Sequence, residues 1–122
     1  MFGRQPPKRY GVSPMDVTIL KLEGRLDTAA VGRMEVGFAA RAGAVMREGD
    51  KAILDLSELT FLSSMGIRLI VTTLKQFRQR GIAFASIAPR EATVKEVLKV
   101  ADLAGHLNLF ETAEAARASL EA

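Results

Sequence analysis

The sequence contains no cysteine and no tryptophan, and it has a single histidine, His106, and a single tyrosine, Tyr10. Without cysteine the chain can form neither a disulfide nor a thiolate metal site, and thiol catalysis is excluded as well. With one histidine, a zinc site would have to rely on carboxylates, and the sequence shows no cluster of them. We therefore expect no bound metal and no cofactor.

Long apolar runs are also missing from the chain. No segment approaches the ~18 consecutive apolar residues that a membrane-spanning helix needs. The first ten residues, Met1–Tyr10, are polar and basic and lack the apolar stretch of a signal peptide. The phosphate-binding patterns G-x-x-x-x-G-K-[ST] and G-x-G-x-x-G do not occur. We therefore expect a soluble, cytoplasmic protein without either nucleotide-binding loop.

The bulk composition is that of one globular domain. The chain has 122 residues, of which 48% are hydrophobic and 25% are charged. We expect residues 1–7 to form a flexible tail and residues 8–122 to form a single domain. The formal net charge of +3 favours an acidic protein partner. Because the basic residues are scattered and aromatic residues are few, no direct contact with nucleic acid is expected.

The N-terminal segment predicts a hairpin of two short strands. Lys8–Val12 fits a first strand, and residues 13–16 form a turn because proline fixes φ while serine and aspartate bond their own backbone. Val17–Leu22 is rich in β-branched side chains and predicts the second strand. These two strands are expected to pair in antiparallel fashion.

A helix is predicted to follow this hairpin and to end near Gly49. Either Asp27 or Thr28 can cap it by accepting a backbone N–H hydrogen bond. Three glycines weaken the helix by up to about 1 kcal/mol each relative to alanine. Its inward-facing side chains recur near helical spacing at Val31, Met34, Phe38 and Val45.

The middle of the chain predicts a buried strand and the most regular helix. Ala52–Leu56 is a short apolar run that fits a central strand, and a loop is expected over Ser57–Leu62. The helix spans Ser64–Arg80, and Gly81 supplies the left-handed residue that ends it. The apolar stripe of this helix consists of Ile67, Ile70, Val71, Leu74 and Phe77.

The last third of the chain repeats the alternation of strand and helix. The expected elements are a strand, a helix, a strand and a helix at Ile82–Ile87, Glu91–Ala101, Leu107–Phe110 and Thr112–Leu120. The inward side chains of the first of these helices are Val94, Val97, Leu98 and Ala101. This alternation predicts an α/β fold with a mixed, mostly parallel sheet of about five strands flanked by about four helices.

Two serines, Ser63 and Ser64, stand where the most regular helix begins. One interpretation is structural, because serine is a preferred N-cap residue. The other is an exposed hydroxyl that accepts a phosphate. A phosphate would add nearly two negative charges where the helix dipole and the free N–H groups favour anions. It should therefore change the surface without melting the helix, which suits the blocking or release of a partner.

Other residues offer weaker functional signals. Met65 and Leu69 form a second apolar row on the same helix, which either packs against a neighbouring helix or anchors a partner. Catalysis has little support, because a serine nucleophile needs a nearby base and His106 is expected in a turn near the final strand. Asp27 and Asp55 make only a weak acid–base pair, and Asp55 is expected to bind backbone N–H groups instead.

Three segments of the sequence resemble the STAS domains of the anti-sigma factor antagonist family. Ile53–Gly66 (ILDLSELTFLSSMG), followed by Ile67–Leu69, is similar to the family's signature. Gly24–Asp27 (GRLD) resembles its first strand-to-helix turn, and Ala104–Ala116 (AGHLNLFETAEAA) its last strand and helix. The segments fall in the family's order, and the likeness runs from about Tyr10 to Leu120.

The resemblance implies the STAS fold and a role in partner switching. The unphosphorylated protein would bind an anti-sigma factor that is a serine kinase of the GHKL ATPase type, which frees the sigma factor and so regulates transcription. Phosphorylation of the antagonist by this kinase would abolish binding, and a PP2C-type phosphatase would restore it. The protein itself would not be an enzyme. The alternative is a constitutive STAS module that serves as a scaffold or as a subunit of a transport complex.

The resemblance also implies particular site residues. Ser64 matches the phosphate acceptor, with Ser63 as the alternative, because Ser63 stands where many members have an aspartate before the acceptor serine. Asp27 matches an acidic residue on the binding face. The expected partner-binding residues are Asp27, Thr28, Ser63, Ser64, Met65, Gly66, Arg68 and Leu69.

Overall fold

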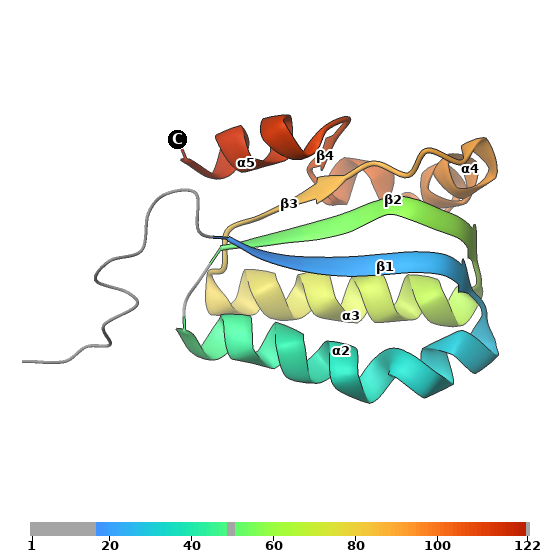
Figure 1. Cartoon of the computed structure of the whole chain (residues 1–122), viewed down its shortest axis with the longest axis horizontal. Helices are drawn as coiled ribbons and strands as arrows, with labels where there is room; N and C mark the ends of the chain where they lie inside the picture. Colours follow the sequence, from blue (N-terminus) through green and yellow to red (C-terminus); the bar gives the residue numbers. More distant parts are fainter. Residues whose placement is uncertain (1–16, 49–50, 122) are drawn as a thin grey trace, which may run out of the picture.

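A parallel sheet in the order β1-β2-β3-β4 forms the centre of the fold (Figure 1). The computed structural model describes residues 17–48 and 51–121. Its strands are β1 (Thr18–Leu26), β2 (Ala52–Leu62), β3 (Phe84–Ile87) and β4 (Leu109–Phe110). Its helices are α2 (Thr28–Glu48), α3 (Ser64–Arg80), α4 (Ala92–Val100), the short 3-10 turn η1 (Ala104–His106) and α5 (Ala113–Glu121).

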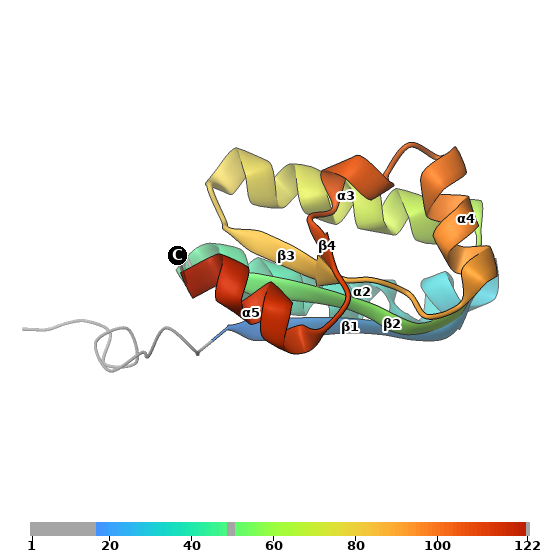
Figure 2. The same cartoon turned by 90° about the horizontal axis from the view of Figure 1, so that it is seen from above.

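The helices cover the two faces of the sheet unequally. Figure 1 shows α2 and α3 side by side on one face and α5 on the other, and Figure 2 gives the same arrangement from above. The larger core lies between the sheet and the α2–α3 layer, and it includes Phe38 and Phe77, both almost fully buried. A smaller core under α5 contains Ile53, Ile87 and Leu120.

The strands of the sheet confirm the predicted α/β class, with parallel pairing throughout the described residues. The sheet there has four strands rather than about five. The predicted first strand at Lys8–Val12, and the turn after it, lie outside the described residues. β1 is longer than expected, because it stays paired with β2 as far as Leu26.

The loop predicted over Ser57–Leu62 is wrong, because β2 continues to Leu62. Opposite β1, the register shifts twice, and each shift places one extra residue in β2. Such bulges break the two-residue alternation of inward and outward side chains. Leu56, Leu59 and Leu62 therefore all face the larger core at a spacing of three, which does not read as a strand in the sequence.

The helices lie close to their predicted positions. α3 has the expected bounds, and Gly81 ends it with φ 70°, in the left-handed region. Its stripe is buried at Ile70, Leu74 and Phe77, while Ile67 and Val71 are half-buried. In α4, Val94 and Leu98 are buried, but the expectation for Ala101 is wrong. That residue is exposed because the helix has already ended at Val100.

Candidate functional site

Two strand-to-helix turns meet at the edge of the sheet where the parallel strands end. One joins β1 to α2 and the other joins β2 to α3. The backbone carbonyl of Leu26 connects them, because it accepts hydrogen bonds from the Ser63 N–H at 3.0 Å and from the Ser63 hydroxyl at 2.8 Å. In parallel α/β sheets, binding sites gather at this edge. The two turns that resembled a known family are thus brought together in space.

Ser63 is the residue that caps α3. Its backbone is extended, with φ −86° and ψ 171°, and its hydroxyl accepts a hydrogen bond from the Gly66 N–H at 3.2 Å. The hydroxyl is therefore both a donor, to Leu26, and an acceptor. The side chain is half-buried. These two hydrogen bonds commit Ser63 to the structure of the turn.

Ser64 is left open to solvent by this arrangement. It is the first residue of α3 and is exposed. Within residues 17–48 and 51–121, no hydrogen bond involves its hydroxyl. Of the two serines that the sequence left as alternatives, Ser63 takes the capping role and Ser64 has the free hydroxyl.

A stability prediction follows from the different roles of the two serines. Ser63→Ala removes the N-cap and the hydrogen bond from the Ser63 hydroxyl to the Leu26 carbonyl. We therefore expect it to lower the free energy of unfolding by about 1–2 kcal/mol. Ser64→Ala is the matched control and should stay within about 0.5 kcal/mol of the native protein. Urea unfolding followed by circular dichroism measures both. Equal stability of the two variants would contradict the capping role of Ser63.

Gly66 lies where α3 packs closely against the ends of β1 and β2. A Cβ at this position would lie 2.7 Å from Leu62 Cδ1, 3.1 Å from Leu26 Cδ2 and 3.1 Å from the Leu26 carbonyl oxygen. The residue is buried. A side chain is excluded at Gly66, one of the predicted partner-binding residues, so that the helix can pack against the strands.

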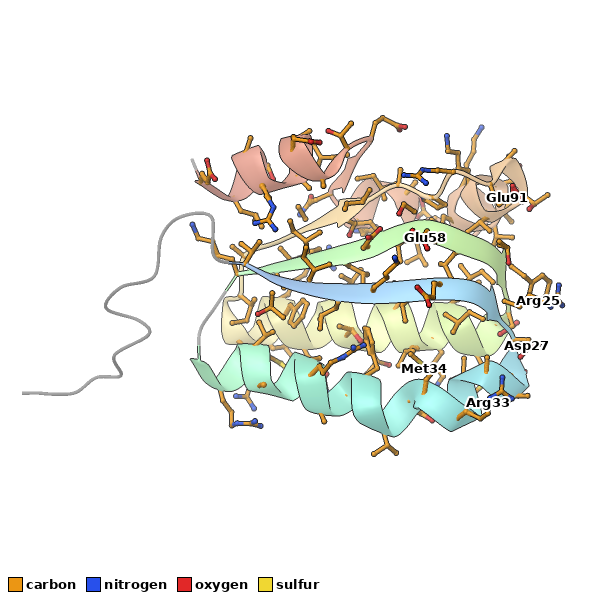
Figure 3. All side chains as sticks on the ribbon, in the orientation of Figure 1. Arg25, Asp27, Arg33, Met34, Glu58 and Glu91 are labelled. Carbon is orange, nitrogen blue, oxygen red and sulfur yellow. The ribbon has the colours of Figure 1, made fainter. Side chains whose placement is uncertain are left out.

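Asp27 caps α2, which settles the choice between Asp27 and Thr28. Asp27 Oδ1 accepts a hydrogen bond from the Ala30 N–H at 2.9 Å. Thr28 is the exposed first residue of the helix. Figure 3 shows Asp27 next to Arg25, and their charged groups lie 3.9 Å apart from Arg25 Nε to Asp27 Oδ2. Asp27 thus stands at the edge of the sheet with an exposed arginine beside it.

Arg25 and Phe61 form a surface feature beside this edge that the sequence did not predict. The Arg25 guanidinium lies 4.3 Å from the centre of the Phe61 ring, a cation–π contact, and Phe61 as a residue is 39% exposed. The two residues are paired across β1 and β2 after the second register shift. The alternation of inward and outward side chains along β2 is the only sequence pattern that could have placed Phe61 on the surface, and the two bulges interrupt it.

Lys21 on β1 forms ion pairs with two glutamates. Its Nζ lies 3.1 Å from Glu58 Oε2 and 3.6 Å from Glu23 Oε1. The hydrogen bond to Glu58 is the main cause that raises the pKa of Lys21 above its ordinary value. A raised lysine pKa stabilises the fold at pH values below the ordinary lysine pKa, and this contribution is lost only as the pH rises through the folded-state pKa. These exposed pairs contribute little at neutral pH.

A groove of about 420 Å³ runs between α2 and α3. Its lining includes Met65, which is half-buried, and Arg68, which is exposed. Leu69, which was predicted either to pack against a neighbouring helix or to bind a partner, is buried because it faces the α2 side of α3. The groove is lined by Glu35, Phe38, Ala39, Ala42, Met65, Arg68, Leu69, Thr72, Thr73 and Gln76.

The residues considered for catalysis do not come together. β1 pairs Lys21 with Asp55, so Asp55 lies about 20 Å along the strands from Asp27 at ~3.3 Å per residue. Asp55 Oδ1 accepts hydrogen bonds from both the N–H and the hydroxyl of Ser57, which agrees with the prediction that Asp55 binds backbone N–H groups. His106 is exposed in η1, and its carbonyl accepts a hydrogen bond from Arg78 at 2.7 Å.

The described part of the chain contains neither a cluster of metal-binding side chains nor a membrane-spanning helix. Among residues 17–48 and 51–121, no group of three or more histidine, aspartate or glutamate side chains is placed to hold a metal ion. No helix in the same ranges has the length and apolar character needed to cross a membrane. The candidate site therefore consists of the Ser64 hydroxyl, the charged side chains of Arg25, Asp27 and Arg68, and the groove between α2 and α3.

Known proteins share this fold. An anti-sigma factor antagonist from Mycobacterium paratuberculosis superposes with a TM-score of 0.70 at 19% identity, over 85% of each chain. The SulP transporter STAS domain from Vibrio cholerae gives 0.62 at 20% identity, over 91% of this chain and 87% of that one. The phosphorylated Bacillus cell fate determinant SpoIIAA gives 0.59 at 21% identity, over 84% and 88%.

Sequence comparison completes the assignment. A comparison with curated proteins returned no match. The sequence profile of the STAS domain matches residues 11–116, which is most of the chain. The matched region includes both strand-to-helix turns, and it agrees with the structural likeness to STAS proteins. The chain therefore belongs to the STAS domain family.

Proposed function

We propose that this protein is an anti-sigma factor antagonist, a cytoplasmic binding protein that phosphorylation of Ser64 switches off. The observation that carries the proposal is the division of roles between two adjacent serines. Ser63 is held in the turn by its hydrogen bonds to Leu26 and Gly66, whereas the Ser64 hydroxyl is exposed and has no hydrogen-bond partner among the described residues. A kinase can reach such a hydroxyl without unfolding the turn.

The partner in this proposal is an anti-sigma factor that is itself a serine kinase of the GHKL ATPase type. It would transfer the γ-phosphoryl group of ATP to Ser64 Oγ. The Oγ–P bond forms, the P–O bond to ADP breaks, and the hydroxyl proton leaves. A PP2C-type phosphatase would hydrolyse the Oγ–P bond and restore the hydroxyl. The STAS protein supplies only the acceptor, so no catalysis of its own is proposed.

Phosphorylation is expected to change the binding surface rather than the fold. The phosphate would be attached to the first residue of α3, where the positive end of the helix dipole favours an anion. Ser63 keeps its capping bonds, so the start of the helix is preserved. The new charge would instead meet whichever partner packs against Asp27, Ser64, Met65 and Arg68, and it would weaken that contact by repulsion and by the cost of desolvating the phosphate.

A second candidate function is a constitutive module that binds one partner whatever the state of Ser64. Two observations favour it. The residue before Ser64 is a serine, so the aspartate found there in many phosphorylated members is missing. The fold is also similar to that of a SulP transporter STAS domain. In this case the protein would be a scaffold or a subunit of a transport complex.

Site-resolved mass spectrometry of the protein isolated from its native host, under several growth conditions, distinguishes the two functions. We expect phosphate on Ser64 at an occupancy that changes with the condition. Phosphate on Ser63 instead would contradict the assigned roles of the two serines, because the Ser63 hydroxyl is engaged in the turn. A protein that carries no phosphate on either serine in any condition would favour the constitutive module.

A further inference from the structure

Arg68 stands one helical turn after Ser64 on α3. Both side chains are exposed, and residues four apart on a helix lie on the same face with their Cβ atoms about 5–6 Å apart. The acidic group of such a pair is most favourable when it precedes the basic one, which is the order that a phosphate on Ser64 would create. The long arginine side chain can span this distance.

Arg68 is also uncommitted. Among the described residues, Arg68 forms no ion pair. It does not pair even with Glu35, which also lines the α2–α3 groove. Arg25, by contrast, already lies over the Phe61 ring and beside Asp27. Of these two arginines, Arg68 is therefore the one with its donors available.

We infer that Arg68 clamps the phosphate of phosphorylated Ser64. The inference rests on the proposal that Ser64 is the phosphate acceptor. The planar guanidinium offers two parallel N–H donors that match two oxygens of a phosphate. The clamp would form within α3 itself and would require no movement of the backbone.

The acidic groups at this end of the fold do not compete with Arg68 for a phosphate. Figure 3 shows Arg25, Asp27 and Arg33 at the end of the fold where α2 begins. The Asp27 carboxylate, which caps α2, repels a phosphate on the β1–α2 side. Glu35 stands across the groove, further along α2. These carboxylates offer a phosphate no attraction, and within the first two turns of α3 Arg68 is the only basic residue.

The clamp has a consequence for the partner surface. Arg68 lines the groove between α2 and α3 when Ser64 is unmodified. Drawn to the phosphate, its guanidinium would no longer be available to a partner that contacts the groove. The charge of the Ser64–Arg68 pair would change from +1 to about −1 near neutral pH. One modification would thus alter two partner-facing groups.

The test uses the full chain with phosphoserine incorporated at position 64 during synthesis, so it needs no kinase. Titration of the phosphate by ³¹P NMR gives its second pKa, which is about 6 for a free phosphoserine. The clamp lowers this pKa, because Arg68 stabilises the dianion. We expect Arg68→Ala to raise it by about half a pH unit.

Lys75→Ala is the matched control. Lys75 is an exposed cation on the same side of α3, seven residues and about 10 Å beyond Arg68. The Lys75→Ala variant shows how far the phosphate pKa changes when a distant positive charge is removed. This change should be much smaller than the one caused by Arg68→Ala. Circular dichroism confirms that each variant is folded. Equal pKa values in Arg68→Ala and Lys75→Ala would overturn the clamp. That result would leave the switch at Ser64 standing, since the phosphate was installed independently of any kinase.

Discussion

Replacing Gly66 with alanine is expected to lower the free energy of unfolding by about 2–3 kcal/mol. The added Cβ would lie 2.7 Å from Leu62 Cδ1, and Leu62 is itself buried in the core. It would also lie 3.1 Å from the Leu26 carbonyl oxygen. That oxygen cannot retreat without weakening the two hydrogen bonds that it accepts from Ser63.

Gly32→Ala provides the matched control for this prediction. Gly32 is an exposed residue of α2, and a Cβ built on it meets nothing within 4 Å. The same substitution should therefore stabilise α2 by up to about 1 kcal/mol, the ordinary helix preference of alanine over glycine. Thermal unfolding followed by circular dichroism measures both, with Gly66→Ala expected to melt about 10 °C below the native protein. A stabilising effect of Gly66→Ala would disprove the close packing described here.

Ser64→Asp is expected to weaken binding to the partner kinase by at least about 100-fold, or roughly 2.7 kcal/mol. The carboxylate places a permanent negative charge at an exposed position that the partner would cover, where it must be desolvated and faces repulsion. Ser64→Ala should bind within about threefold of the native protein, because the hydroxyl makes no contact that the turn needs. Isothermal titration calorimetry against each GHKL-type serine kinase of the native host measures these affinities.

Ala118→Asp is the control for a general effect of charge on binding. Ala118 is exposed on α5, on the opposite face of the sheet from α2 and α3, so the same charge there should leave affinity unchanged. Equal affinities of Ser64→Asp and Ser64→Ala for every such kinase would contradict the switch. Stable association of all three variants with one partner would instead support the constitutive module.

The bounds of α3 show what could be predicted from local signals. The apolar stripe along this helix recurs at helical spacing, and Gly81 supplies the conformation that ends it, so both follow from nearby residues. The second half of β2 shows the opposite case. Its two register shifts are set by pairing with β1, a strand some thirty residues earlier, so the inward leucines lose the alternation by which a strand is recognised.

In the candidate site, too, some features could be predicted from local sequence and others depend on contacts between distant residues. Ser63 and Ser64 could be located from the sequence, since a serine pair before a regular helix is either a cap or an exposed hydroxyl. Their roles could not be separated, because the deciding contact is with the carbonyl of Leu26, which is distant in sequence. The burial of Leu69 could not be decided from the sequence, because helical spacing does not say which side of α3 a neighbouring helix covers.

Short-range patterns are enough to predict the class of the fold, the order of its main helices and the position of the serine pair, because these depend on spacing, capping and composition within short windows. Long-range contacts are needed to show which serine is free, why position 66 excludes a side chain, and that Arg25 lies over Phe61. Each of these depends on the meeting of β1 with the β2–α3 turn. That meeting is fixed by the parallel pairing of strands separated by a whole helix, which short-range patterns cannot encode.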